Sequence, residues 1–130
     1  MLLDTSFLID LMQENEEAKA KAEELTAGSV ALMVGTPTMF ELYLGVGLAI
    51  KSAEEREKVL EALRSLTQVH LDGASATRAG AVYAQRTKEG TSIDAEDAMI
   101  AGIAIENQQA VLTRNVKHFA GIAGLKVEQY

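Results

Sequence analysis

The sequence predicts a three-layer α/β/α fold with a mostly parallel central sheet. Short uncharged runs at residues 29–34 and 110–113 alternate with longer segments in which apolar residues recur at helical spacing. Uncharged strands are typical of a sheet that is covered on both faces. Strands that alternate with helices favour parallel pairing, because a crossover helix returns the chain to the same end of the sheet.

Six elements are expected in the first half of the chain. They are a strand at 1–4, helices at 6–12 and 14–25, a strand at 29–34, and helices at 36–50 and 52–66. The third helix begins at Thr36-Pro37, because proline suits the first helical turn. The fourth helix begins at Ser52, where Glu55 completes a capping box.

Six further elements are expected in the second half. They are a strand at 68–71, helices at 74–88 and 95–107, a strand at 110–113, a short helix at 116–122 and a strand at 126–129. Asp72 caps the first of these helices, and Gly90 closes it. Because no linker, low-complexity tract or repeat interrupts the 130 residues, we expect a single domain over 1–130.

Composition limits the metal chemistry and the compartment. The chain has no cysteine and only two histidines, so oxygen atoms are the realistic metal ligands and the expected cation is a hard one. No apolar run approaches the ~20 residues that span a bilayer. The N-terminus also lacks the charged and apolar regions of a signal peptide. We therefore expect a cytoplasmic protein with no membrane partner.

The charge balance argues against broad nucleic-acid binding. With 19 acidic and 12 basic residues, the chain carries a net charge of −7, whereas nonspecific binding relies on a basic face. A nucleic-acid substrate would depend on bridging metal ions and on local cations, for which Arg114 and Lys117 are the candidates. The basic residues between Lys51 and Arg64 are interleaved with glutamates, which is typical of a solvated helix face.

Polar side chains stand where two of the apolar strands end. Asp4, followed by Thr5 and Ser6, ends the first strand, and Asn115 follows the strand at 110–113. In open α/β sheets, ligands bind in the crevice beyond the carboxyl ends of the strands. We therefore expect both segments to border one crevice.

Three more carboxylates are placed near helix starts that can reach this crevice. Glu41 lies in the first turns of the helix at 36–50, and Asp94 and Asp97 are three residues apart at the start of the helix at 95–107. Two unit charges ~5 Å apart repel by about 3 kcal/mol at an effective dielectric of ~20, so such a cluster needs a cation. Mg²⁺ or Mn²⁺ suits these ligands and also catalyses phosphodiester hydrolysis.

Each of these residues also has a purely structural explanation. Asp4 and Asp94 are good helix caps, and Asp97 can complement the helix dipole. Glu41 can close a capping box that begins at Thr38. Turn, surface or packing roles are the simplest interpretation of the remaining polar residues, namely Asn115, His70 and His118.

Four segments form a combined pattern. They are Leu3-Asp4-Thr5-Ser6-Phe7-Leu8-Ile9-Asp10, Phe40-Glu41-Leu42, Asp97-Ala98-Met99-Ile100-Ala101 and Leu112-Thr113-Arg114-Asn115-Val116-Lys117-His118-Phe119. In order and spacing, from one end of the chain to the other, they resemble the motifs of PIN-domain proteins, specifically the VapC-type toxins of toxin–antitoxin pairs.

The resemblance implies a parallel, PIN-like α/β fold, a Mg²⁺- or Mn²⁺-dependent ribonuclease, a homodimer and a cognate antitoxin. It maps the acidic positions of the family onto Asp4, Glu41 and Asp97. The supporting polar positions that it implies are Thr5, Ser6, Thr113 and, at the fourth and more variable corner, Asn115.

The chain departs from the family pattern at two positions. The first aspartate of the family's Gly-Asp-x-Asp segment falls on Ala95, and Asp94 is expected to compensate from one residue earlier. The aspartate that often precedes the last phenylalanine is replaced by His118. Both departures bear on whether a second metal ion binds.

The predicted function is cleavage of RNA phosphodiester bonds by a metal-dependent endoribonuclease, the toxin of a VapBC-type pair. Asp4, Glu41 and Asp97 are expected to position a metal ion that activates water. Asp94 and Asn115 are expected to orient waters or a second ion. The alternative is a catalytically weak PIN domain that binds RNA or an antitoxin. A phosphatase or phosphoacceptor domain is disfavoured, because no second aspartate follows closely after the first strand.

Overall fold

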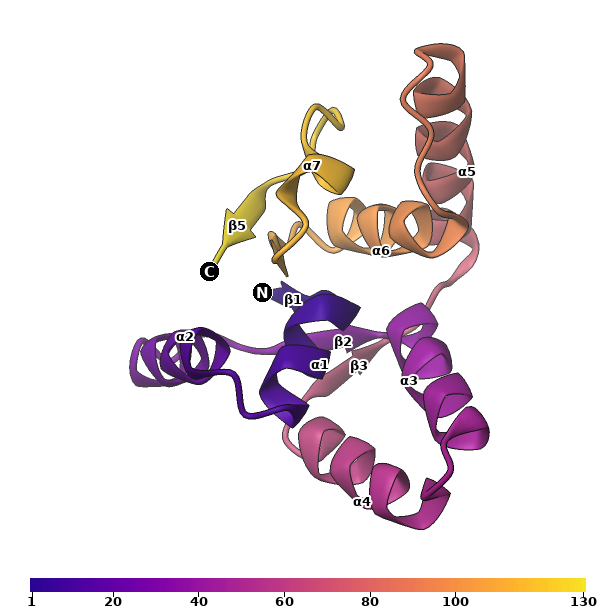
Figure 1. Ribbon diagram of the computed structural model, residues 1–130. Helices are drawn as coiled ribbons and strands as arrows, with labels where there is room; N and C mark the ends of the chain where they lie inside the picture. Colours follow the sequence, from indigo (N-terminus) through magenta and orange to yellow (C-terminus); the bar gives the residue numbers. More distant parts are fainter.

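A five-stranded parallel sheet, in the order β3-β2-β1-β4-β5, runs through the middle of the molecule, which the computed structural model describes over residues 1–130 (Figure 1). The strands are β1 (Leu2–Leu3), β2 (Met33–Gly35), β3 (Thr67–Val69), β4 (Val111–Thr113) and β5 (Val127–Gln129). The helices are α1 (Thr5–Met12), α2 (Glu16–Ala27), α3 (Thr36–Leu48), α4 (Ser52–Leu63), α5 (Gly73–Lys88), α6 (Ala95–Glu106) and α7 (Val116–Phe119). Every strand pair is parallel, so the predicted fold class is confirmed.

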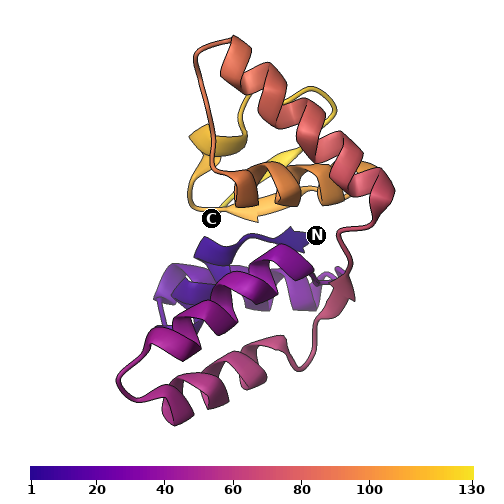
Figure 2. The ribbon, with the colours of Figure 1, turned by 90° about the vertical axis from the view of Figure 1, so that its right-hand side faces the viewer.

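Alternate side chains of the two central strands enter two separate cores. Leu3 and Leu112 pack in one core with residues of α1 to α4, whereas Leu2 and Val111 pack in the other with residues of α6 and α7. Figure 2 shows α1 to α4 on one side of the sheet and α5 to α7 on the other. Both faces of these strands are buried. A charged side chain on either face would lie in a core, which explains why the runs in the sequence are uncharged.

The order of the strands reverses between β1 and β4. From β1 the chain passes outward to β2 and β3, and from β3 it crosses back to β4 and β5. Leu3 pairs with Leu112. Asp4, which follows β1, and Thr113, the last residue of β4, therefore lie at the same edge of the sheet. Ligands bind at such switch points in open α/β sheets, because the connections on either side diverge and leave a crevice.

Several predicted boundaries were wrong by a few residues. The second helix begins at Glu16, because Asn15 caps it and Glu14 has a positive φ of 57°. The capping box predicted at Ser52 is also wrong, since Ser52 is already helical and Lys51 precedes it without a side-chain cap. Strand β2 begins later than predicted, and α4 and α7 end earlier. None of the helices has both the length and the apolar character needed to cross a membrane.

Candidate active site

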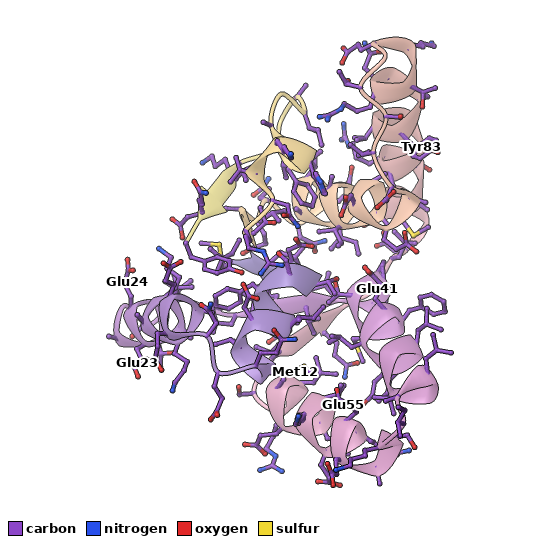
Figure 3. The ribbon with its side chains drawn as sticks, viewed as in Figure 1. Met12, Glu23, Glu24, Glu41, Glu55 and Tyr83 are labelled. Atoms are coloured by element: carbon purple, nitrogen blue, oxygen red, sulfur yellow. The ribbon has the colours of Figure 1, made fainter.

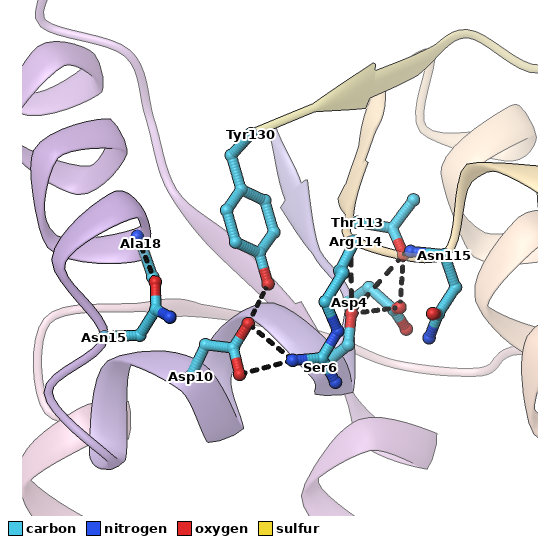
Figure 4. A network of polar contacts seen from close by, with 9 residues as sticks. All are labelled: Asp4, Ser6, Asp10, Asn15, Ala18, Thr113, Arg114, Asn115 and Tyr130. Atoms are coloured by element: carbon cyan, nitrogen blue, oxygen red, sulfur yellow. Dashed lines mark hydrogen bonds and ion pairs between the residues drawn. The ribbon is translucent and has the colours of Figure 1, made fainter.

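Asp4 lies at the centre of a polar network at the carboxyl end of β1 (Figure 4). It is 4% exposed, and its Oδ2 accepts hydrogen bonds from Ser6 Oγ at 3.0 Å and from Thr113 Oγ1 at 2.7 Å. Although Asp4 directly precedes α1, its side chain makes no capping hydrogen bond. The capping interpretation of Asp4 is therefore wrong. The two hydroxyl groups hold one of its oxygens in place and leave the other for a ligand.

The same hydroxyl groups join the end of β4 to α1. Ser6 Oγ accepts a hydrogen bond from the backbone nitrogen of Arg114 at 3.3 Å, and Thr113 Oγ1 accepts one from that of Asn115 at 2.9 Å. Asn115 precedes α7, but its side chain makes no capping hydrogen bond. The structure thus brings Ser6, Thr113 and Asn115 together around Asp4, as the sequence predicted.

Glu41 enters the site from the N-terminal half of α3, the end of this helix that lies near α6 (Figures 1 and 3). Its Oε1 accepts a hydrogen bond from Thr5 Oγ1 at 3.0 Å, and Thr5 Oγ1 also lies 3.2 Å from Thr38 Oγ1. Because α3 begins at Thr36, Thr38 is inside the helix and fully buried. The capping box from Thr38 to Glu41 is therefore wrong, and Thr5 positions Glu41.

The surroundings of Glu41 favour its protonated form. Burial raises the pKa of Glu41 above its usual value, and the hydrogen bond from Thr5 opposes this shift. The negative charges of Glu96, Asp4 and Asp97 raise the pKa further. Glu96 is a half-buried residue that the sequence pattern did not single out. Glu96 lies beside the site because α6 packs against α3. No local feature of the sequence predicts this packing.

Asp97 enters from the first turn of α6, opposite α3. Burial and the charge of Asp4 raise the pKa of Asp97 to about 6, while the neighbouring His118 opposes the shift and Asp94 adds to it. His118 Nδ1 lies 3.1 Å from Asp97 Oδ2. His118 is on the surface, as predicted, but it is also the partner of this carboxylate. Asp94 precedes α6 without a side-chain cap, so its carboxylate is not used for capping.

Arg114 makes a contact that the sequence did not predict. Its Nη1 donates to both carboxylate oxygens of Asp10, at 2.6 and 2.8 Å, and Tyr130 Oη donates to Asp10 Oδ2 at 2.6 Å (Figure 4). The ring of Tyr130 stands edge-on to Phe7, with centroids 4.8 Å apart. Asp10 is buried, so this ion pair balances much of the Arg114 charge. Ser6 and Asp10 are four residues apart on α1, so they lie on the same face of the helix. This spacing was the sequence feature that could have placed Asp10 beside the site.

The donor set fits a hard divalent cation. Carboxylate oxygens are the ligands that Mg²⁺ and Mn²⁺ prefer. Burial first, and then neighbouring negative charges, raise the pKa values of Glu41 and Asp97, and a bound cation stabilises the ionised form of such groups. No group of three or more histidine, aspartate and glutamate side chains stands close enough together to form a ready-made coordination shell. Mg²⁺ keeps several waters when it binds to proteins. One or two carboxylates would therefore be enough to bind the ion directly, and the other carboxylates would contact its waters.

Comparison with known proteins shows the family of the chain. The family model of the PIN domain matches residues 1–125, and the chain belongs to this family. The chain is 31% identical to ribonuclease VapC1 of Methanocaldococcus jannaschii, over 98% of this chain and 85% of the relative. It is 26% identical to the tRNA(fMet)-specific endonuclease VapC of Shigella flexneri, over 99% of this chain and 96% of the relative.

Solved structures of VapBC proteins have the same fold. VapBC from Salmonella typhimurium bound to DNA matches with a TM-score of 0.88 and 25% identity, over 98% of this chain and 96% of that chain. VapBC2 from Rickettsia felis bound to a promoter fragment matches with a TM-score of 0.91 over 99% of this chain and 97% of that chain. Its 22% identity makes it evidence for the fold alone.

Proposed function

We propose that this protein is a metal-dependent endoribonuclease that acts as the toxin of a VapBC-type pair. The observation that carries the proposal is that Asp4 after β1, Glu41 of α3 and Asp97 of α6 are near enough for their charges to affect one another's pKa values. They lie at the switch point of a PIN-domain sheet. The names of the similar VapC proteins support RNA as the substrate. The chain spans nearly their whole length.

Asp4, Glu41 and Asp97 would hold Mg²⁺ or Mn²⁺. A metal bound there supplies a water of lowered pKa and stabilises the charge that develops on the phosphate. The hydroxyls of Ser6 and Thr113 fix Asp4, and the hydroxyl of Thr5 fixes Glu41. These hydrogen bonds fix the side chains of the two carboxylates, which is the preorganisation that a catalytic site needs.

Asp94 and Asn115 occupy the outer positions of the site. Neither side chain is used to cap the helix that follows it. We assign them to the orientation of waters or of a second ion. Arg114 and Lys117 are the proposed RNA contacts. Arg114 forms an ion pair with Asp10, whereas Lys117 forms no ion pair within the chain.

The test is cleavage of single-stranded RNA, whose splayed bases and flexible backbone enter a narrow crevice more easily than a duplex. Activity should require Mg²⁺ or Mn²⁺ and stop with EDTA. Asp4→Asn and Glu41→Gln should each abolish it while the circular dichroism spectrum stays native. Asp72→Asn is the matched control, because asparagine also caps α5 and Asp72 lies outside the site. Full activity in Asp4→Asn or Glu41→Gln would remove that residue from the site.

The alternative function is a catalytically weak PIN domain that works by binding RNA or an antitoxin. The spread of the carboxylates, with no ready-made group of three, is the observation that favours it. RNA binding without metal-dependent cleavage of any single-stranded substrate would decide for this alternative.

We also propose that the chain forms a homodimer and binds a VapB-like antitoxin. The structural relative VapBC-5 from Mycobacterium tuberculosis is described as a member of the VapBC family of toxin–antitoxin systems. An apolar face on α3 is available for such a contact, because Phe40 and Leu44 are 63% and 51% exposed.

A further inference from the structure

Half of the lysine and arginine residues of this acidic protein have no acidic partner. Six of the twelve lysine and arginine residues form ion pairs with carboxylates, namely Lys19, Lys21, Lys58, Arg64, Arg78 and Arg114. The other six are Lys51, Arg56, Arg86, Lys88, Lys117 and Lys126. Two of these six, Arg86 from α5 and Lys117 from α7, line the same pocket, although 31 positions separate them in the sequence.

This pocket has a volume of about 270 Å³ and adjoins the candidate active site, because Asp97 and His118 are part of its wall. Drug-sized ligands occupy pockets of roughly 300–1,000 Å³, so this one suits a smaller group such as one sugar–phosphate unit. Thr91 and Ser92 also line it. Thr91 Oγ1 donates to the carbonyl oxygen of Arg86 at 3.4 Å, and the hydroxyl group of Ser92 can donate a hydrogen bond to an anion.

Arg86 is fixed in place without being neutralised. Its Nε donates to the carbonyl oxygen of Thr91 at 2.8 Å, and its Nη1 donates to that of Ala120 at 2.9 Å. Two carbonyl groups hold the guanidinium in a defined position but carry no net charge, so its positive charge remains available. Lys117, on the short helix α7, adds a second charge from the other wall.

The acidic residues of the pocket must be weighed against these cations. Asp97 lies beside His118, and Asp94, at the start of α6, is the second carboxylate of the wall. The pocket therefore holds as many cations as carboxylates, whereas the whole chain carries a net charge of −7. An anion is repelled less here than by the molecule as a whole.

The opposite rim of the site has a different chemistry. The groove between α1, α3 and α4 is lined by Ile9, Leu42 and Gly45 together with Glu41, and its one lysine is paired with a glutamate. An apolar and acidic wall repels a polyanion. A nucleic-acid strand that crosses the carboxylates is therefore drawn toward α7 and not toward α4.

We infer that the pocket between α5, α6 and α7 is the subsite for a backbone phosphate of the RNA strand, adjacent to the phosphate that is cleaved. This assignment rests on the proposed ribonuclease function. It gives Lys117 and Arg86 the role of holding the substrate strand, and it adds Arg86 to the residues that the sequence motifs indicate.

The experiment compares Lys117→Gln with Lys51→Gln, an identical change at an exposed, unpaired lysine outside the pocket. Binding of a fluorescent single-stranded RNA of mixed sequence is measured by anisotropy in EDTA at several salt concentrations, and KM and kcat are measured in Mg²⁺. Lys117→Gln should weaken binding and raise KM roughly 3- to 10-fold, with kcat within about twofold. It should lower the slope of log K against log salt by about 0.7, the value for one lost phosphate contact on a single strand.

Lys117→Arg keeps the charge and should restore binding to near the wild-type level, which separates lost charge from altered packing. Lys51→Gln should behave as the wild type. Equal RNA affinity and equal salt slope for Lys117→Gln and the wild type would overturn the subsite while leaving the ribonuclease proposal intact. Absence of both RNA binding and cleavage in the wild type would overturn the proposed function and the subsite together.

Discussion

The carboxylates of the candidate site differ in how the protein holds them. Asp4 receives two hydroxyl hydrogen bonds and Glu41 receives one, whereas Asp97 receives none from a hydroxyl and faces His118 instead. Asp97 is also the residue whose pKa rises to about 6. Burial, followed by the charge of Asp4, therefore disfavours the ionised form of Asp97.

The first prediction concerns removal of this charge. Asp97→Asn should leave the metal-free protein as stable as the wild type or more stable at pH 7.5, because a raised pKa means that the ionised form destabilises the fold by about 1.4 kcal/mol for each pKa unit. The gain should be on the order of 1 to 2 kcal/mol, since the lost contact with His118 offsets part of it. Mn²⁺ should raise the melting temperature of the wild type, and the variant should show a smaller rise.

Thermal unfolding in EDTA and in Mn²⁺ measures both effects. A metal-free Asp97→Asn protein that is markedly less stable than the wild type would support a helix-dipole role for Asp97, because only then does the negative charge favour the fold.

The second prediction is the pH dependence of the same group. Between pH 3.8 and about 6 the folded protein holds a proton on Asp97 that the unfolded chain has already released. Stability of the metal-free protein should therefore contain a contribution that is present below pH 3.8 and is lost as the pH rises to about 6. Metal binding should show the opposite trend, because protons compete for the carboxylate. The melting-temperature rise caused by Mn²⁺ should shrink below pH 6, and a rise that is constant from pH 5 to 8 would contradict this.

At the level of elements, α6 contributes Asp97 to the site, and α5 packs against α6. Gly102 of α6 lies against the backbone of α5: a Cβ atom there would stand 2.5 Å from the carbonyl oxygen of Ser75 and 2.8 Å from the nitrogen of Ala79. Backbone atoms within a helix cannot move aside singly, so the two helices can approach this closely only with glycine at position 102.

The third prediction is that Gly102→Ala destabilises the protein by about 1 to 3 kcal/mol, the usual cost of overpacking, even though alanine is the better helix former. Gly80→Ala on α5 is the control, because nothing lies within 4 Å of its Cβ position. That change should stabilise by up to about 1 kcal/mol through helix propensity. Urea unfolding measures both variants, and equal stabilisation by both would show that α5 and α6 pack less closely than described.

At the scale of the whole molecule, the chain exposes an apolar face along α3 and the loop that follows it. Phe40 is 63% exposed, Leu44 51% and Leu48 79%, and Glu41 stands between the first two in sequence at the mouth of the site. A carboxylate crevice beside an apolar helix face is complementary to a peptide with one basic and several apolar residues.

The fourth prediction follows from this juxtaposition and from the proposed antitoxin. The antitoxin should place an arginine or lysine near Asp4, Glu41 and Asp97 and should dock apolar residues around Phe40, Leu44 and Val46. Because its basic group takes the place of the cation, Mn²⁺ titrated into the complex should weaken the affinity, measured by calorimetry. An affinity that is unchanged from EDTA to millimolar Mn²⁺ would mean that the antitoxin acts elsewhere, by covering the RNA path or the dimer surface.

The sequence by itself determined the parallel three-layer fold and the segments that build the site. Uncharged strands and polar strand ends are local features, so Asp4 and Thr113 could be placed from the pattern alone. Only the tertiary structure decided which partner each side chain has. The bond from Thr113 to Asp4 spans 109 positions and that between His118 and Asp97 spans 21, and such contacts depend on how helices pack. For the same reason the capping interpretation of Asp4 could be rejected only in three dimensions, where its carboxylate is seen to accept hydroxyl groups instead of backbone amides.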